Sequence, residues 1–190
     1  DIYFKRDDLL GLAAGGNKTR KLEFVVADAL AKRADTLITC GAIQSNHCRL
    51  TLSAAVKEGL DCRLVLEERI PGTYNPKATG NNLLYRLLGA KEIKVCSNGG
   101  DVNAAMEEMA QRISLEGHRP YVIPVGASTP IGVLGYIACA QEILIQAETA
   151  GIKYNQIICV SGSGGTQAGL VLGFAADDDV TVTGINVSNT

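Results

Sequence analysis

Three cations within four positions follow a pair of glycines near the start of the chain, in the run GGNKTRK at residues 15–21. The glycines permit a tight turn and Asn17 is a favourable helix cap, so we predict a helix that begins at Lys18. Helix N-termini are positive, and Lys18 and Lys21 share one helix face, so both amines are placed unfavourably. A lysine held near other cations or away from water has a lowered pKa, and its neutral amine can attack a carbonyl carbon. The run therefore predicts a reactive lysine, with a solvated basic turn as the alternative.

A second polar run, QSNH at residues 44–47, stands between an expected strand at 36–41 and an expected helix at 46–58. In open α/β sheets, ligands bind where the carboxyl ends of strands meet helices. The backbone N–H groups and the polar side chains of such a turn suit a small carboxylate or phosphate. An ordinary Ser/Asn helix cap is the alternative for this run.

A third run, SGSGGT at residues 161–166, contains three glycines in four positions. Glycines allow close backbone approach and the following helix has a positive end, so a phosphate cradle is the natural interpretation. The run lacks the lysine of a G-K-[ST] loop, which disfavours NTP hydrolysis, and it is not a G-x-G-x-x-G fingerprint. A nucleotide-binding α/β module and a turn used only for tight packing remain as alternatives.

Strand-like and helix-like patterns alternate along the chain. The expected strands are 2–6, 36–41, 62–67, 92–96, 120–125, 156–161 and 180–187. The expected helices are 18–32, 46–58, 79–89, 102–116, 131–149 and 166–176. This alternation predicts an α/β fold with largely parallel sheets.

Composition restricts the class of protein. With 190 residues, 46% of them hydrophobic and 20% charged, the chain can bury a proper core. A net charge of −2 gives no general attraction to nucleic acid or to an anionic membrane, and no continuous apolar run reaches the roughly 18 residues of a membrane span. The six cysteines form no C-x-x-C pair and there are two histidines, so we expect reduced thiols, a cytoplasmic location and no metal site. The abrupt first and last residues suggest a piece of a longer protein.

The three polar runs resemble those of the fold-type-II pyridoxal-phosphate enzymes, which are related to the tryptophan synthase β chain. The similar branch contains D-cysteine desulfhydrase and 1-aminocyclopropane-1-carboxylate deaminase. The residues that carry the resemblance are 5–9, 15–23, 41–49 and 161–169, with a looser match at 126–136. Residues 40–49 and 65–69 are more similar to the desulfhydrase than to the deaminase, and the L-cysteate sulfo-lyases share much of the pattern.

The resemblance implies a role for each run toward the cofactor pyridoxal 5'-phosphate. Lys18 would hold it covalently and act in catalysis. The phosphate would be held by Lys21 and by the turn Gly162, Ser163, Gly164, Gly165 and Thr166. Asn46 would hydrogen-bond the phenolic oxygen of the cofactor, and the residues Ser45, Asn46 and His47 would receive the substrate carboxylate. If Lys18 lies on the wrong side of the substrate proton, Ser45 or a tyrosine of the missing C-terminal part would serve as the base.

The resemblance also implies the architecture and the reaction. It implies two open, twisted, mainly parallel sheets flanked by helices, with residues 1–21 and 129–190 forming an incomplete large cofactor domain and residues 22–128 a small inserted domain. The C-terminal part of the large domain would be missing from the chain. We expect α,β-elimination of D-cysteine to pyruvate, hydrogen sulfide and ammonia by a homodimer, with the deaminase and sulfo-lyase reactions as alternatives. Ala127 and Thr129 depart from the family pattern around Ser128.

Overall fold

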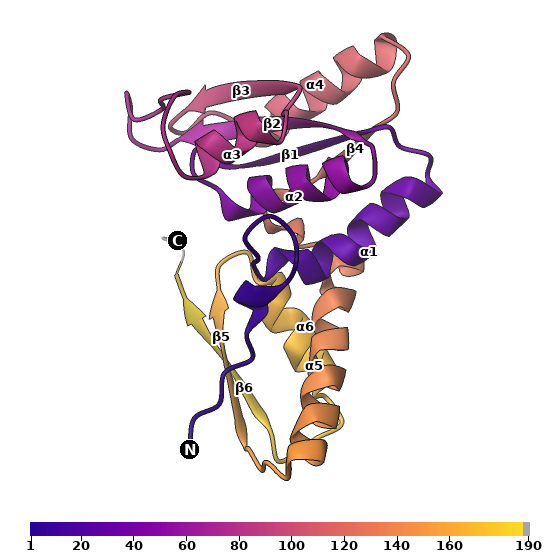
Figure 1. The fold of residues 1–190 in the computed structure, drawn as a ribbon, viewed down its shortest axis with the longest axis vertical. Helices are drawn as coiled ribbons and strands as arrows, with labels where there is room; N and C mark the ends of the chain where they lie inside the picture. The colour runs from indigo at the N-terminus through magenta and orange to yellow at the C-terminus, as the bar shows by residue number, and fades with distance from the viewer. Residues whose placement is uncertain (188–190) are drawn as a thin grey trace.

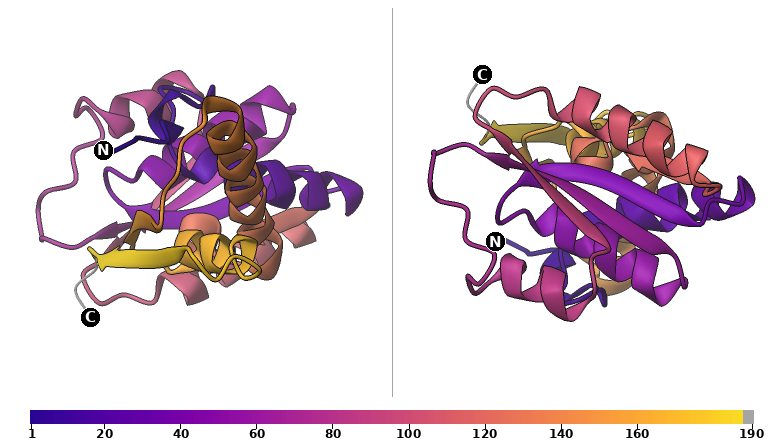
Figure 2. Two further views of the ribbon diagram at one scale, coloured as in Figure 1. Left: turned by 90° about the horizontal axis from the view of Figure 1, so that it is seen from below. Right: turned by 90° about the horizontal axis from the view of Figure 1, so that it is seen from above.

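The computed structural model describes residues 1–187 and contains two layered units, each built on a parallel sheet (Figure 1). In the first unit four strands lie in the order β3-β2-β1-β4, and every neighbouring pair is parallel. These strands are β1 (Thr36–Ala42), β2 (Asp61–Glu68), β3 (Glu92–Ser97) and β4 (Pro120–Ile123). The helices between them are α2 (Asn46–Lys57), α3 (Asn81–Leu87) and α4 (Val102–Leu115). Helices α2 and α3 cover one face of the sheet and α4 covers the other (Figure 2).

Side-chain alternation along the strands explains this sandwich. Leu37 of β1 is fully buried in the core with α2, and its neighbour Ile38 is fully buried in the core with α4. Successive side chains of a strand point to opposite faces, so a strand that is apolar at every position needs cover on both sides. The short apolar runs therefore become the centre of a two-sided sheet.

The second unit is smaller in the described part of the chain. It contains the parallel strands β5 (Gln156–Ser161) and β6 (Thr181–Asn186), with helices α5 (Pro130–Ala150) and α6 (Gly165–Gly173) packed on them. Its core consists of Tyr136, Cys139, Ala140, Leu170 and Phe174.

Helix α1 (Lys18–Ala31) joins the two units. Its first turn lies against α5 at Gly135, where an added Cβ atom would collide with the carbonyl oxygen of Arg20. Its apolar face, which includes Leu22 and Val26, is buried in the core shared with α2 and β1. The chain returns to the second unit through the short 3₁₀ turn Val125–Ala127, in which Gly126 has φ +69°. A 3₁₀ turn at Asp7–Leu9 precedes α1.

The predicted α/β fold with parallel sheets is confirmed within residues 1–187, including each expected helix. The strand expected at 2–6 is wrong: the segment forms no ladder, and Ile2 and Phe4 are exposed. Side-chain contacts hold it instead, since Lys5 Nζ binds Glu142 Oε2 of α5 at 2.7 Å. The division into domains at residues 22 and 128 stays a prediction.

Helix α5 is the one described helix that is long and apolar enough, by length and composition, to cross a membrane. An 18-residue window within it has a mean hydropathy of 1.3, although no continuous apolar run of that length occurs in the sequence, as expected. Gln141 and Glu142 interrupt the apolar residues near the middle of the helix, so the run is not continuous. In the structure α5 packs on α1 and α6, and a core helix satisfies the same test.

Candidate active site

Lys18 occupies the first position of α1 and is half-buried. Its Nζ donates to Asn17 Oδ1 at 3.2 Å, and Asn17 Nδ2 in turn donates to Thr166 Oγ1 at 3.4 Å. The side chain of Asn17 therefore connects the lysine to the glycine-rich turn and does not cap α1, which corrects the expected capping role. Burial lowers the pKa of Lys18, which increases the share of neutral, nucleophilic amine.

Buried polar contacts anchor the peptide that carries Lys18. The hydroxyl of Tyr136 lies 2.7 Å from Asp7 Oδ2 and 3.2 Å from the carbonyl oxygen of Asn17. Asp7 also accepts a hydrogen bond from Arg20 Nε at 2.9 Å. This network ties the start of α1 to the N-terminal segment and to α5.

Lys21 lies one turn later on the same face and is fully buried. Its Nζ donates to the carbonyl oxygen of Gly126 and to Ser128 Oγ, both at 3.2 Å. Burial, and then the charge of Lys18, lower the pKa of Lys21 to about 8. No acidic side chain pairs with this ammonium in residues 1–187, so a bound anion would raise its pKa.

The glycine-rich turn lies directly against Lys21. A Cβ atom at Gly165 would come 2.8 Å from Lys21 Nζ and 2.7 Å from Ser128 Oγ, so only glycine fits there without displacing them. Gly164 has φ +79° and forms the N-cap of α6 with no side-chain cap. Ser163 Oγ lies 2.6 Å from Ser128 Oγ. The positive end of α6, the hydroxyls and the Lys21 ammonium therefore converge on one place.

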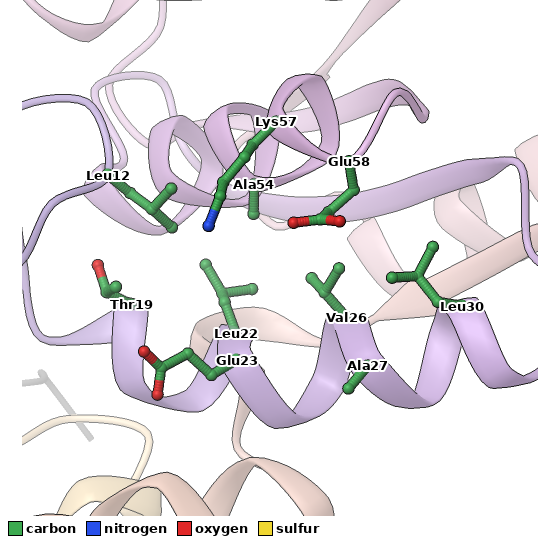
Figure 3. A pocket seen from close by; sticks show the side chains of 10 residues that line it. All are labelled: Leu12, Thr19, Leu22, Glu23, Val26, Ala27, Leu30, Ala54, Lys57 and Glu58. Atoms are coloured by element: carbon green, nitrogen blue, oxygen red, sulfur yellow. The ribbon is translucent and has the colours of Figure 1, made fainter.

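A cavity of about 490 Å³ brings several of these residues together. Its lining includes Asn17, Lys18, Gly162, Ser163, Gly164 and Thr166. A second pocket, of about 270 Å³, lies between α1 and α2 and is largely apolar (Figure 3). Its ionisable side chains are Glu23, Lys57 and Glu58, and none of the predicted site residues lines it. We therefore place the candidate site at the larger cavity.

The turn at 44–47 does not line the larger cavity, and Arg49 connects it to the loop before Lys18. Ser45 Oγ accepts a hydrogen bond from the N–H of Cys48 at 3.2 Å and so caps α2. In this structure the Ser45 hydroxyl therefore acts as an ordinary helix cap, which was the alternative interpretation of this run. Asn46 is exposed, and its Oδ1 accepts from Asn81 Nδ2 at 2.8 Å and from Arg49 Nη2 at 3.3 Å. Neither Ser45 nor Asn46 is among the residues that line the larger cavity.

The side chain of His47 lies against β1. Its ring is buried and its Nε2 lies 2.8 Å from Thr39 Oγ1 of β1, and His47 is not among the residues that line the cavity. Burial, and then the charges of Lys18 and Lys21, lower its pKa to about 3, so the imidazole is neutral at ordinary pH. In this structure the His47 imidazole contacts Thr39 and does not line the cavity, so a contact of His47 with the substrate carboxylate stays a prediction.

Comparison with known proteins decides the family. The family model described as pyridoxal-phosphate dependent enzyme matches residues 1–190. The chain belongs to this family. Its cofactor is pyridoxal 5'-phosphate.

Solved structures of this family give the degree of likeness. A structure described as an ACC deaminase homologue is 43% identical, with a TM-score of 0.85, and the match covers 96% of this chain and 54% of that one. A threonine deaminase from the organism abbreviated T.th. is 23% identical with a TM-score of 0.64, covering 89% of this chain and 49% of that one. Diaminopropionate ammonia lyase of Escherichia coli is 16% identical with a TM-score of 0.63, covering the same shares of the two chains. The last two show the fold alone, and the chain spans about half the length of the proteins it matches.

The residues that line the larger cavity, together with Lys21 and Gly165 beside it, fit the family's cofactor. Lys18 supplies an amine with a lowered pKa, and Lys21 supplies a buried cation without an acidic partner in the described residues. The turn 162–166 supplies the positive helix end beside them. The amine of Lys18 therefore suits the aldehyde of the cofactor, and Lys21 with the turn 162–166 suits its phosphate.

Sequence reasoning missed three residues of this site. Asn17 bridges Lys18 and Thr166, Ser128 bridges Lys21 and Ser163, and Arg49 joins Gly15 to Asn46. Ser128 stood in the looser family match at 126–136, but that match assigned it no contact.

Proposed function

We propose that the full-length enzyme is a D-cysteine desulfhydrase. D-Cysteine and water would be converted to pyruvate, hydrogen sulfide and ammonia, with the β carbon–sulfur bond and the carbon–nitrogen bond broken. The observation that carries the proposal is the half-buried Lys18, whose lowered pKa and position beside the phosphate cradle suit a covalent cofactor site. The sequence likeness at 40–49 and 65–69 supports the desulfhydrase among the related reactions.

The cofactor supplies the electron sink that makes the α-proton of an amino acid acidic. Lys21 and the turn 162–166 bind and orient the phosphate. Lys18 provides the amine, and once it is free it takes the α-proton at Nζ. Ser45 serves as base in place of Lys18 if the proton lies on the opposite side. Asn46 and the backbone of the turn 44–47 orient the substrate.

A second candidate is supported by one observation, the 43% identity to a structure described as an ACC deaminase homologue. The deaminase reaction would open an aminocyclopropane ring to give 2-oxobutanoate. An L-cysteate sulfo-lyase would instead release sulfite.

A substrate panel separates these reactions. Purified full-length enzyme loaded with cofactor is supplied with D-cysteine, L-cysteine, β-chloro-D-alanine, L-cysteate and 1-aminocyclopropane-1-carboxylate, and the oxo acid released is measured. We expect pyruvate and sulfide, with D-cysteine preferred. Preference for the cyclopropane substrate moves the enzyme to the deaminases, and sulfite from L-cysteate moves it to the sulfo-lyases. No oxo acid from any of the five overturns the proposal.

We further propose a cytoplasmic homodimer. The six cysteines are unpaired within the described residues, which suits a reducing compartment. Light scattering of the full-length enzyme measures its mass, and a mass of one chain would contradict the dimer.

A further inference from the structure

Arg49 is a buried cation beneath the turn at 44–47. It lies in the first turn of α2, three residues after Asn46, and only 5% of it is exposed. Its Nη2 donates to the carbonyl oxygen of Gly15 at 3.1 Å and to Asn46 Oδ1 at 3.3 Å. One guanidinium therefore connects the loop that precedes Lys18 with the side chain of Asn46.

The charge of Arg49 has no counter-ion in residues 1–187. No Asp or Glu of this part of the chain pairs with it, and its buried Nε and Nη1 atoms have no hydrogen-bond partner there. Arg20, which is equally buried, instead forms ion pairs with Asp7 and Glu142. A buried charge without a partner is strongly unfavourable, so Arg49 stands where folding alone would favour an apolar side chain.

A second source of positive potential lies at the same place. Helix α2 has twelve residues, begins directly after Ser45 and carries no acidic residue in its first turn. Its N-terminal N–H groups and the Arg49 guanidinium therefore act in the same direction on the turn at 44–47. Both groups therefore favour one bound negative charge at this turn.

We propose that Arg49 is a positioning residue for the carboxylate of an amino-acid substrate: it holds Asn46 and the Gly15 loop together and supplies the positive charge that this carboxylate offsets. The inference rests on the proposed function, which brings an amino acid to this turn. It predicts that Arg49 contributes to the discrimination between an amino acid and its amide.

The experiment compares a carboxylate with its amide. D-Alanine and L-alanine, which lack a β-leaving group, and the corresponding alaninamides are titrated into full-length enzyme loaded with cofactor. Binding is followed by the change in the visible absorbance of the cofactor. We expect Arg49→Met to weaken binding of the preferred alanine by about tenfold or more, and binding of its amide by less than about threefold.

Two further variants serve as controls. Arg49→Lys keeps the charge but loses the planar donor fork, and we expect it to recover part of the preference for the carboxylate. Lys57→Met removes an exposed charge at the far end of the same helix and should leave the ratio of the two affinities unchanged. Thermal unfolding supplies an independent readout, because a nearly isosteric apolar side chain in place of an unpaired buried charge should leave the midpoint unchanged or raise it.

The outcomes separate the two proposals. If wild-type enzyme responds to neither alanine, the proposed amino-acid chemistry is overturned and this inference falls with it. If wild type responds and Arg49→Met binds alanine equally well, only the inference is overturned. A lowered unfolding midpoint with equal losses for alanine and alaninamide shows that Arg49 is purely structural, which also overturns it.

Discussion

Lys18 and Lys21 have the same side chain and share a helix face, yet their surroundings give them different tasks. Lys18 lines the larger cavity, where its amine can reach a bound molecule. Lys21 is enclosed behind it by Gly126 and Ser128. Spacing alone shows that the two amines are neighbours, and burial decides which of them reacts.

Replacing each lysine should separate attachment from phosphate binding. In full-length enzyme, Lys18→Ala should abolish the covalent lysine adduct that borohydride traps. Lys5 is the other lysine that lines the cavity in the described residues, and its Nζ is held by Glu142 at 2.7 Å. Lys21→Ala should keep the adduct and weaken cofactor affinity about tenfold, through loss of one charged contact. Peptide mapping of the reduced protein locates the adduct. An adduct retained in Lys18→Ala with normal turnover would contradict the assignment.

The lowered pKa of Lys21 predicts a pH dependence of stability. In the folded chain this pKa is about 8, whereas an unfolded lysine titrates near 10.4. Between these values the unfolded chain binds more protons, so stability rises with pH. In cofactor-free full-length protein, the free energy of unfolding should rise from pH 8 to pH 10.4 relative to Lys21→Met, by at most roughly 3 kcal/mol. Urea unfolding at several pH values measures it, and parallel curves for the two proteins would contradict it.

Sequence patterns predict site residues that are close together in the sequence, but they do not predict contacts between residues that are far apart in it. Lys18, Lys21 and the turn 162–166 were predictable because their spacing is itself the signal. The contact between Lys21 and Ser128 spans 107 residues of sequence, and nothing local to either residue announces it. The contact of His47 with Thr39 could not be predicted either, because the polar run does not show which way the imidazole ring points.

At the scale of elements, the start of α6 is sensitive to the conformation of Gly164. A β-branched residue is strained at φ +79°, so Gly164→Val should distort the turn and lower cofactor affinity about tenfold or more. Gly151→Val is the matched control, since Gly151 has φ +64° at the end of α5 with open space around it. Both variants should lose stability, and only Gly164→Val should lose cofactor affinity. Equal cofactor affinity in the two would show that the turn serves packing.

The crossing of α1 and α5 depends on Gly135. An added Cβ atom would collide with the backbone of Arg20 and Lys21, so Gly135→Ala must move the two helices apart. We expect a lower unfolding midpoint together with weaker cofactor binding, because Lys18 and Lys21 belong to the displaced turn. Gly11→Ala, which meets nothing within 4 Å, is the control. A Gly135→Ala enzyme with both properties intact would show that the helices adjust without moving the lysines.

Elements whose apolar period is long and unbroken were predictable from the sequence, and α2 and β2 are examples. The segment 2–6 was not, because a strand exists only where another strand offers its edge. Its residues have the composition of a strand and lie unpaired in the described part of the chain.

At the scale of the whole molecule, the second unit exposes apolar strands. Ile158 is 64% exposed, Val160 is 62% exposed and Ile185 is 51% exposed. Exposed apolar strands with free edges favour association. The isolated chain 1–190 should therefore bind a hydrophobic dye and form aggregates, and Ile158→Lys should reduce both. Fluorescence and light scattering measure them, and weak dye binding equal to that of the full-length enzyme would contradict the prediction.

The close crossing at Gly135 has a consequence for how the molecule can move. The first turn of α1 is pressed backbone to backbone against α5, while the rest of α1 packs with the four-stranded unit. If that unit rotates about the crossing, Lys18 lies close to the rotation axis and moves little. Asn46, at the start of α2, lies farther from the axis and moves more. Closure on a substrate would then move the turn at 44–47, which we propose to hold the substrate carboxylate, toward the amine of Lys18.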